Sequence, residues 1–281
     1  LGDVYKRQGL IRLYRDQGKR VAVLAIDPTS PYSGGAILGD RIRMQQHFTD
    51  AGVFIRSIAT RGHLGGLSRS TGDVLHVLHA AEFDVVILET VGVGQDELEV
   101  TQLADTTLVV MAPGLGDDIQ AIKAGILEVA DVFAVNKSDR AGADATAQDL
   151  QQMLSLRRVP VGVGQMQGHT AVSTLRRGPE AEAGEWVPPI IKTIAHRKEG
   201  IPALVEAFEK HREFLTTTDA GRAIQANRRL AELRAILVQA LIDEVDTRFA
   251  DRVSAKLDEI LEGRADPYTC AEALVREAIR G

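Results

Sequence analysis

Short, nearly continuous apolar runs recur along this chain, and they constrain its fold more than any other feature. They lie near residues 21–26, 53–57, 84–89, 107–111, 132–136 and 190–194. Runs of this kind form strands that are buried on both faces of a sheet, and helical patterns separate most of them. The sequence therefore predicts an α/β fold with a mainly parallel sheet. From Ile201 onward the pattern changes to helices without strands, which predicts a helical C-terminal extension.

A polar tetrapeptide, Asn136-Lys137-Ser138-Asp139, follows one of these runs. Open α/β sheets bind ligands beyond the carboxyl ends of their strands, so this loop falls where a binding site is expected. Asp139 would accept hydrogen bonds from N1-H and N2-H2 of guanine, Asn136 would fix the loop, and the stem of Lys137 would cover the base. Adenine lacks this donor pair, and such a site rejects an analogue without it by roughly 10⁴-fold. Taken alone, the tetrapeptide also fits an ordinary surface loop.

A glycine-rich turn follows another run, at Glu89-Thr90-Val91-Gly92. Glu89 would hold a water of a Mg²⁺ shell, and the Gly92 amide would approach a terminal phosphate closely because no side chain intervenes. Gln95, shortly after, would orient the attacking water. The alternative is a plain strand-to-helix turn.

Asp27 ends the run at 21–26 and places a second carboxylate at the same edge of the sheet. The segment that follows mixes glycine, acid and base around Asp40, in the manner of a mobile switch loop. We expect Asp27 and Asp40 to join Glu89 as Mg²⁺ ligands.

Four tracts together resemble the MeaB/ArgK family of P-loop GTPases, in both order and spacing. They are residues 25–31, 37–41, 89–95 and 136–139, and the resemblance covers about residues 9–281. It implies a Mg²⁺-dependent protein that binds GTP or GDP and hydrolyses GTP. It also implies a chaperone of an adenosylcobalamin-dependent acyl-CoA mutase of the methylmalonyl-CoA mutase type, which gates cofactor loading and protects the mutase. The resemblance further places Thr193 and Ala195 over the guanine and makes the C-terminal helices a homodimer arm.

The chain departs from this family in one respect, because no Gly-Lys pair in its 281 residues is followed by Ser or Thr. Such a pair ends the phosphate-binding loop, whose amides and lysine hold the phosphates. We therefore predict a P-loop NTPase domain that lacks its first strand and phosphate loop, binds GDP weakly and hydrolyses GTP negligibly. Residues 1–8 match nothing in the family and are expected to be a non-native junction, followed by a GTPase domain at 9–200 and the extension at 201–281.

Composition narrows the remaining function classes. A net charge of −6 disfavours a broad nucleic-acid surface, and the single Cys270 excludes an internal disulfide. No apolar stretch reaches the roughly 20 residues that cross a bilayer, so we expect a cytoplasmic protein without a membrane partner.

Two other functions stay open at this point. One is an ArgK-like ATPase linked to amino-acid transport, against which Asp139 argues because it prefers guanine. The other is a nucleotide-responsive scaffold that binds without turnover. The apolar stripe after Leu230 has two interpretations as well, packing on the chain's own sheet domain or dimerisation.

Overall fold

The computed structural model contains all six predicted strands. It describes residues 2–28, 49–60, 66–90, 101, 103–114, 129–156 and 185–280. The strands are β1 (Val21–Pro28), β2 (Val53–Thr60), β3 (Val85–Thr90), β4 (Leu108–Met111), β5 (Val132–Asn136) and β6 (Ile190–Thr193). The chain divides into two compact units, Leu1–Gln225 and Ala226–Gly281, and each is described by itself.

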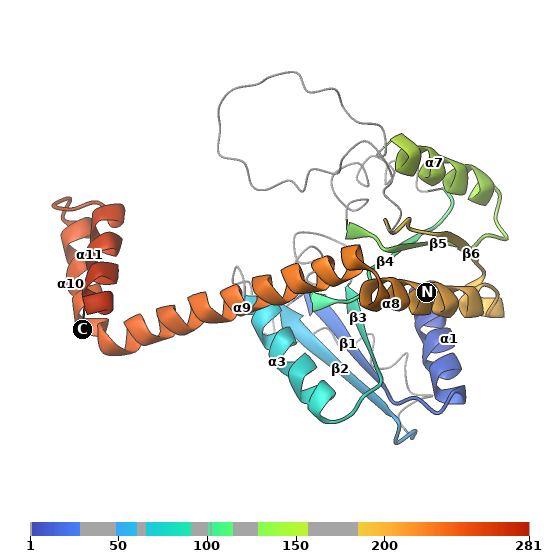
Figure 1. The fold of residues 1–281 in the computed structure, drawn as a ribbon, viewed down its shortest axis with the longest axis horizontal. Coiled ribbons are helices and arrows are strands. Elements are labelled where there is room, and N and C mark those ends of the chain that lie inside the picture. Colours follow the sequence, from blue (N-terminus) through green and yellow to red (C-terminus); the bar gives the residue numbers. More distant parts are fainter. Residues whose placement is uncertain are drawn as a thin grey trace. The chain divides into compact units, whose positions relative to one another are not determined.

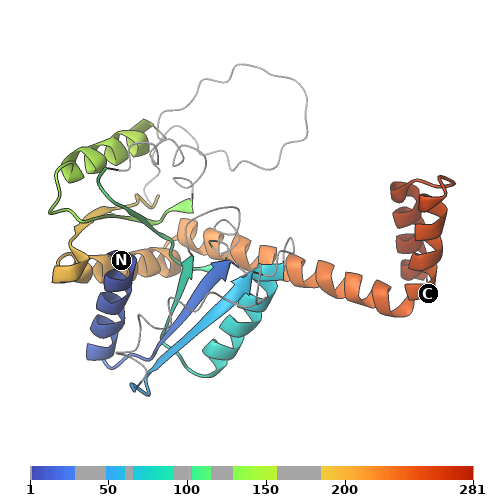
Figure 2. The ribbon, with the colours of Figure 1, turned by 180° about the vertical axis from the view of Figure 1, so that it is seen from behind.

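The strands form two three-stranded sheets, with the orders β2-β1-β3 and β4-β5-β6. Every pairing is parallel, as the buried apolar runs predict. Figure 2 shows β1, β2 and β3 side by side. The predicted α/β class with a parallel sheet is confirmed, although the sheet is present as two halves.

Helices cover both faces of the first sheet because side chains alternate along β1. Val21 and Val23 belong to a cluster that contains Leu204, whereas Ala22 and Leu24 pack with Leu78 on the other face. The helices of the first unit are α1 (Gly2–Asp16), α3 (Gly66–Ala80), α7 (Ala143–Leu156) and α8 (Ile201–Thr217), and they are labelled in Figure 1. Fully burying a valine or leucine side chain contributes about 1.5–3 kcal/mol, which makes β1 a main source of stability.

One hydrophobic cluster joins the two sheets. It combines Val21 of β1 and Val132 of β5 with Ile11 of α1 and Leu204 of α8, and all four side chains are fully buried. Helices α1 and α8 therefore lie under both halves of the sheet and hold them in one unit.

The outer edges of β3 and β4 carry no partner strand among the residues that the structure describes. The side chains of β3 are only half-buried along its whole length, in contrast to those of β1 and β5. In β4, Val110 is 38% exposed.

A polar cluster closes the other end of β5, where the strand begins. His211 of α8 is buried, with Nδ1 2.9 Å from Oγ1 of Thr106 and Nε2 3.4 Å from Oδ1 of Asp131. The indole of Trp186 donates to the Asp131 carbonyl at 2.7 Å and packs on the His211 ring, with 4.7 Å between ring centroids. The cluster ties α8 to the start of β5.

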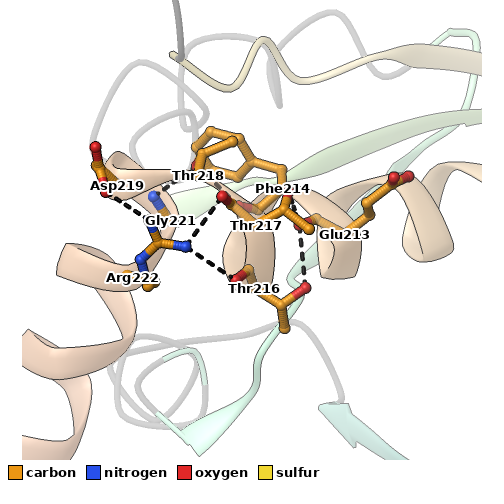
Figure 3. Close-up of polar contacts among 8 residues, drawn as sticks. All are labelled: Glu213, Phe214, Thr216, Thr217, Thr218, Asp219, Gly221 and Arg222. Atoms are coloured by element: carbon orange, nitrogen blue, oxygen red, sulfur yellow. Dashed lines mark hydrogen bonds and ion pairs between the residues drawn. The ribbon is translucent and has the colours of Figure 1, made fainter.

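A tight elbow joins α8 to α9 (Asp219–Arg248), and Figure 3 shows its contacts. Thr218 is extended and breaks the helix, and its hydroxyl donates to the Phe214 carbonyl at 2.8 Å. The same hydroxyl accepts the Gly221 amide at 3.0 Å, which caps the first turn of α9. Arg222 donates to the Thr217 carbonyl at 3.0 Å, so the last carbonyls of α8 are also satisfied.

The second unit consists of the rest of α9, α10 (Ala250–Leu261) and α11 (Pro267–Arg280). An ion pair between Arg252 and Glu277 links α10 to α11, and Cys270 is buried. The predicted apolar stripe on α9 is exposed, with exposed fractions of 44% to 62% at Leu230, Leu233, Leu237 and Leu241. None of the helices within the described ranges is long and apolar enough to cross a membrane.

Candidate guanine-nucleotide site

The predicted site residues come from the carboxyl ends of β1, β3 and β5. Asp27 lies near the end of β1, Glu89 near the end of β3, and Asn136 is the last residue of β5. In the first sheet Glu89 is in register with Ala25, so Asp27 and Glu89 stand on adjacent strands at the same edge. The structure describes the backbone of Asp27 but not its side chain.

The base loop, residues 136–139, begins where β5 ends. Asn136 is 3% exposed, whereas Asp139 is exposed at the surface. Lys137 adopts a left-handed conformation with φ of 58°, which turns the chain sharply, and its carbonyl accepts the amide of Arg140 at 3.0 Å. The loop thus buries its asparagine and leaves its aspartate exposed to solvent.

A second loop, residues 193–200, closes against the base loop, and we call it the closing loop. Oδ1 of Asn136 accepts hydrogen bonds from Oγ1 of Thr193 and from the amide of Ala195, both at 3.3 Å. The carbonyl of Thr193 accepts the Ser138 amide at 3.1 Å and the Ser138 hydroxyl at 3.2 Å. Three of the predicted base-site residues, Asn136, Thr193 and Ala195, are therefore brought into contact.

Ser138 was not singled out in the sequence, although it supplies two of the four bonds between these loops. It occupies the variable position of the tetrapeptide, so the pattern alone attaches no role to it. The sequence signal for Ser138 is a small hydroxyl side chain between two charged residues. Its role becomes visible only once β5 is seen to pair with β6.

Glu89 forms an ion pair with Arg7 of α1, which the sequence did not suggest. The Arg7 side chain is 3% exposed and that of Glu89 is 22% exposed. A buried guanidinium is costly unless a carboxylate neutralises it, so this pairing offsets the burial of Arg7. The Glu89 carboxylate supplies oxygen atoms, which are the ligands that Mg²⁺ prefers. A metal ion would have to replace the Arg7 guanidinium beside it.

Four predicted features cannot be placed. Asp40, Gly92 and Gln95 lie outside the described residues, as does the side chain of Asp27. Within the parts of the chain that are described, no three His, Cys, Asp or Glu side chains come together as a metal site. The Mg²⁺ ligands therefore stay a prediction.

Residues 6–250 match the family model described as "Methylmalonyl Co-A mutase-associated GTPase MeaB". A Pyrococcus abyssi protein called "Putative GTPase" is 42% identical over 276 residues, which are 97% of this chain and 78% of that protein. GTPase ArgK of Escherichia coli is 35% identical over 218 residues, 78% of this chain and 60% of ArgK.

The fold has a counterpart among solved structures. The crystal structure of an LAO/AO transport system kinase matches with a TM-score of 0.60 and 22% identity, covering 100% of this chain and 78% of that one. At this identity the likeness shows a shared fold only. The sequence matches are stronger, and they show that the chain belongs to the MeaB family of GTPases.

Proposed function

We propose that the chain recognises guanine through Asp139 and that its full catalytic form hydrolyses GTP to control an adenosylcobalamin-dependent acyl-CoA mutase. One observation carries the first part: Asn136 is buried at the end of β5 and held by Thr193 and Ala195, while Asp139 is exposed beside it. Hydrogen bonds between the two loops would hold the base site in one conformation. Preorganised donors and acceptors lose little entropy on binding, which favours selective recognition.

The base would bind with its N1-H and N2-H2 donors on the Asp139 carboxylate. The aliphatic stem of Lys137 would lie over the ring, and Ala195 would bring its backbone close to the base. Adenine would leave the carboxylate without donors, so ATP is a poor substrate for such a site.

Hydrolysis would use Mg²⁺ to neutralise the charge that develops on the phosphates. Glu89 and Asp27 stand on adjacent strands, at the edge of the sheet formed by the carboxyl ends of the strands. From there they would organise the metal shell together with Asp40. Gly92 would contact the γ-phosphate and Gln95 would orient the water. In this chain Glu89 would first have to leave Arg7.

The sequence contains no phosphate-binding loop of the G-K-S/T type, which supplies the main phosphate contacts in such enzymes. We therefore propose weak GDP binding and negligible GTP turnover for the chain of 281 residues. The described residues place no strand beside the outer edges of β3 and β4, which supports this, since a strand between them would lead to the loop.

The second part of the proposal is that the partner is a mutase. It is supported by the description of the matching family, which names methylmalonyl-CoA mutase. A GTPase with such a partner would gate loading of the adenosylcobalamin cofactor and protect the mutase from inactivation. We propose that both proteins meet in the cytoplasm.

Homodimerisation would use the exposed stripe on α9. The exposed side chains of Leu233, Leu237 and Leu241 recur at helical spacing, and a contiguous apolar stripe of this kind marks an interaction surface. A second copy of the chain would cover the stripe with its own. The other interpretation is packing of the stripe on the chain's own sheet domain.

A scaffold that binds nucleotide without turnover is the second candidate. The lack of the phosphate loop favours it for this particular chain. The ArgK-like ATPase is less well supported, because the E. coli relative is itself named a GTPase and Asp139 disfavours adenine. Single-turnover hydrolysis by a form with the phosphate loop, with and without a mutase, separates these functions.

The direct test is a calorimetric titration of GDP and of ADP, each with Mg²⁺. The two proteins compared are this chain and a longer version with the upstream strand and phosphate loop of a close relative. We expect tight binding only in the longer version, where GDP should bind more tightly than ADP. Asp139→Asn in that version should abolish the preference, while Asp149→Asn, an exposed acid on α7, should leave it unchanged.

Equal affinity for GDP and ADP in the longer version would refute the role of Asp139. Equal GDP affinity in both versions would refute the role given to the phosphate loop.

A further inference from the structure

Gly200 is the last residue of the closing loop, where the chain comes back against the end of β6. Ile194 and Glu199 form an isolated antiparallel bridge, in which the Ile194 amide donates to the Glu199 carbonyl at 3.1 Å. A single 3₁₀ turn, η2 (Ala195–Arg197), spans the distance between them. The Leu204 amide donates to the Gly200 carbonyl at 3.1 Å, and Gly200 is the residue just before the first turn of α8.

Two independent features require glycine at this position. Its φ is +79°, a left-handed conformation that residues with a Cβ adopt at a cost. A Cβ would also collide with the Lys192 carbonyl oxygen and would lie 2.9 Å from Cγ2 of Thr193. The neighbouring atoms are backbone and a buried side chain, so they have little freedom to move away.

Thr193 is the residue that this collision would displace, and it carries most of the bonds to the base loop. Its hydroxyl donates to Asn136, and its carbonyl accepts both donors of Ser138. A shift of Thr193 would therefore release Asn136 and Ser138 together.

The backbone supports the same conclusion. In the described part of the chain, three non-glycine residues have positive φ, and two of them, Lys137 and Lys198, lie in these two loops. Strain of this kind persists only where surrounding contacts hold it, and it gathers at functional sites. The closing loop and the base loop thus form one strained unit.

We infer that Gly200 is a positioning residue for guanine recognition: it lets the closing loop fold back so that Thr193 and Ala195 hold Asn136 in place. This inference rests on the proposed guanine site. Gly200 touches no base itself, and its effect passes through Thr193.

Gly200→Ala in the full chain tests the inference, with Gly18→Ala as the matched control. Gly18 has nearly the same φ, +77°, but its Cβ would meet no atom of the described residues within 4 Å. Hydrogen exchange should show the protection of the Ser138 and Ala195 amides falling by about tenfold or more in Gly200→Ala relative to the control. The Ala134 amide in the core of β5 reports global unfolding, and its protection should fall less than that of Ser138 and Ala195.

Saturation-transfer difference NMR with guanosine and with adenosine supplies the functional readout, because nucleosides test the base contacts without phosphates. The unchanged chain and Gly18→Ala should prefer guanosine, and Gly200→Ala should lose this preference. Gly200→Asn offers a second variant, since asparagine tolerates the left-handed conformation but keeps the colliding Cβ. It should show the same local loss even where the alanine variant does not fold.

Unchanged protection of Ser138 and Ala195 in both Gly200 variants would overturn the inference. Loss of protection in a chain that shows no guanosine preference to begin with would support the positioning role and refute the guanine site. The two failures are therefore distinguishable.

Discussion

Gly221 in the elbow offers a test in which two physical effects predict opposite signs. It lies in the first turn of α9, with an ordinary helical backbone, so helix propensity alone predicts that Gly221→Ala stabilises the protein by up to about 1 kcal/mol. The structure predicts the reverse. A Cβ at Gly221 would collide with the Phe214 carbonyl oxygen and would lie 2.5 Å from Cα of Leu215 and 2.8 Å from the Phe214 carbonyl carbon.

These neighbours are backbone atoms of α8, and Leu215 is fully buried, so the helix cannot retreat without disturbing the core. Forcing a methyl group into a packed site costs about 1–3 kcal/mol. The movement would also strain the hydrogen bond from Gly221 to Thr218. After a gain in propensity of about 1 kcal/mol is subtracted, we expect a net destabilisation of up to about 2 kcal/mol.

Gly72→Ala is the matched control, because Gly72 is inside α3 and, among the described residues, its Cβ would meet only Leu103, at 4.0 Å. This substitution should stabilise the chain by about 0.5–1 kcal/mol. Urea unfolding followed by fluorescence of the single tryptophan measures both variants, since Trp186 packs 5.6 Å from the Phe214 ring at the end of α8. Stabilisation by both alanines would refute the close packing of the elbow.

Three further outcomes are expected. Burial raises the pKa of Tyr14 to about 12, with the negative charge of Glu209 adding to the effect, so the folded chain holds this proton more tightly than the unfolded chain. Its contribution, about 2–3 kcal/mol, is complete below about pH 10 and is lost as pH rises to 12, and Tyr14→Phe should remove this alkaline loss in denaturant titrations. Trp186→Phe removes the bond to the Asp131 carbonyl and should lower stability by about 1–3 kcal/mol, measured by circular dichroism. Lys192 lowers the pKa of the Asp144 carboxyl by direct hydrogen bonding, so Asp144→Asn should reduce the thermal midpoint at neutral pH, and this difference should shrink as pH falls below about 4.

Local patterns were sufficient to predict the strands and the position of the base loop. A continuous apolar run such as 132–135 is buried on both faces wherever it lies, and the polar tetrapeptide after it stands at the strand end by covalent connection. The family resemblance placed Thr193 over the guanine, but its contact with Asn136 was not predicted, since pairing of β5 with β6 depends on tertiary structure.

Contacts between distant residues explain most of what was missed. The pairing of Arg7 with Glu89 joins α1 to β3 and leaves no local trace in either segment. The need for glycine at position 200 comes from the returning carbonyl of Lys192, which no pattern around Gly200 reveals. The break at Thr218 was also missed, because helical spacing continues through it and only the hydroxyl contacts in the elbow show where α8 ends.

The open edges of β3 and β4 affect how the solution state of this protein must be measured. Strand edges with free amides and carbonyls are templates for pairing with another molecule, and the described residues supply no strand that covers either one. Concentrated samples are therefore prone to non-native association through the sheet, with a mass equal to that of the proposed α9 dimer. A molecular mass by itself therefore cannot distinguish the proposed α9 dimer from aggregation through the sheet. Leu237→Glu should disrupt only the α9 dimer.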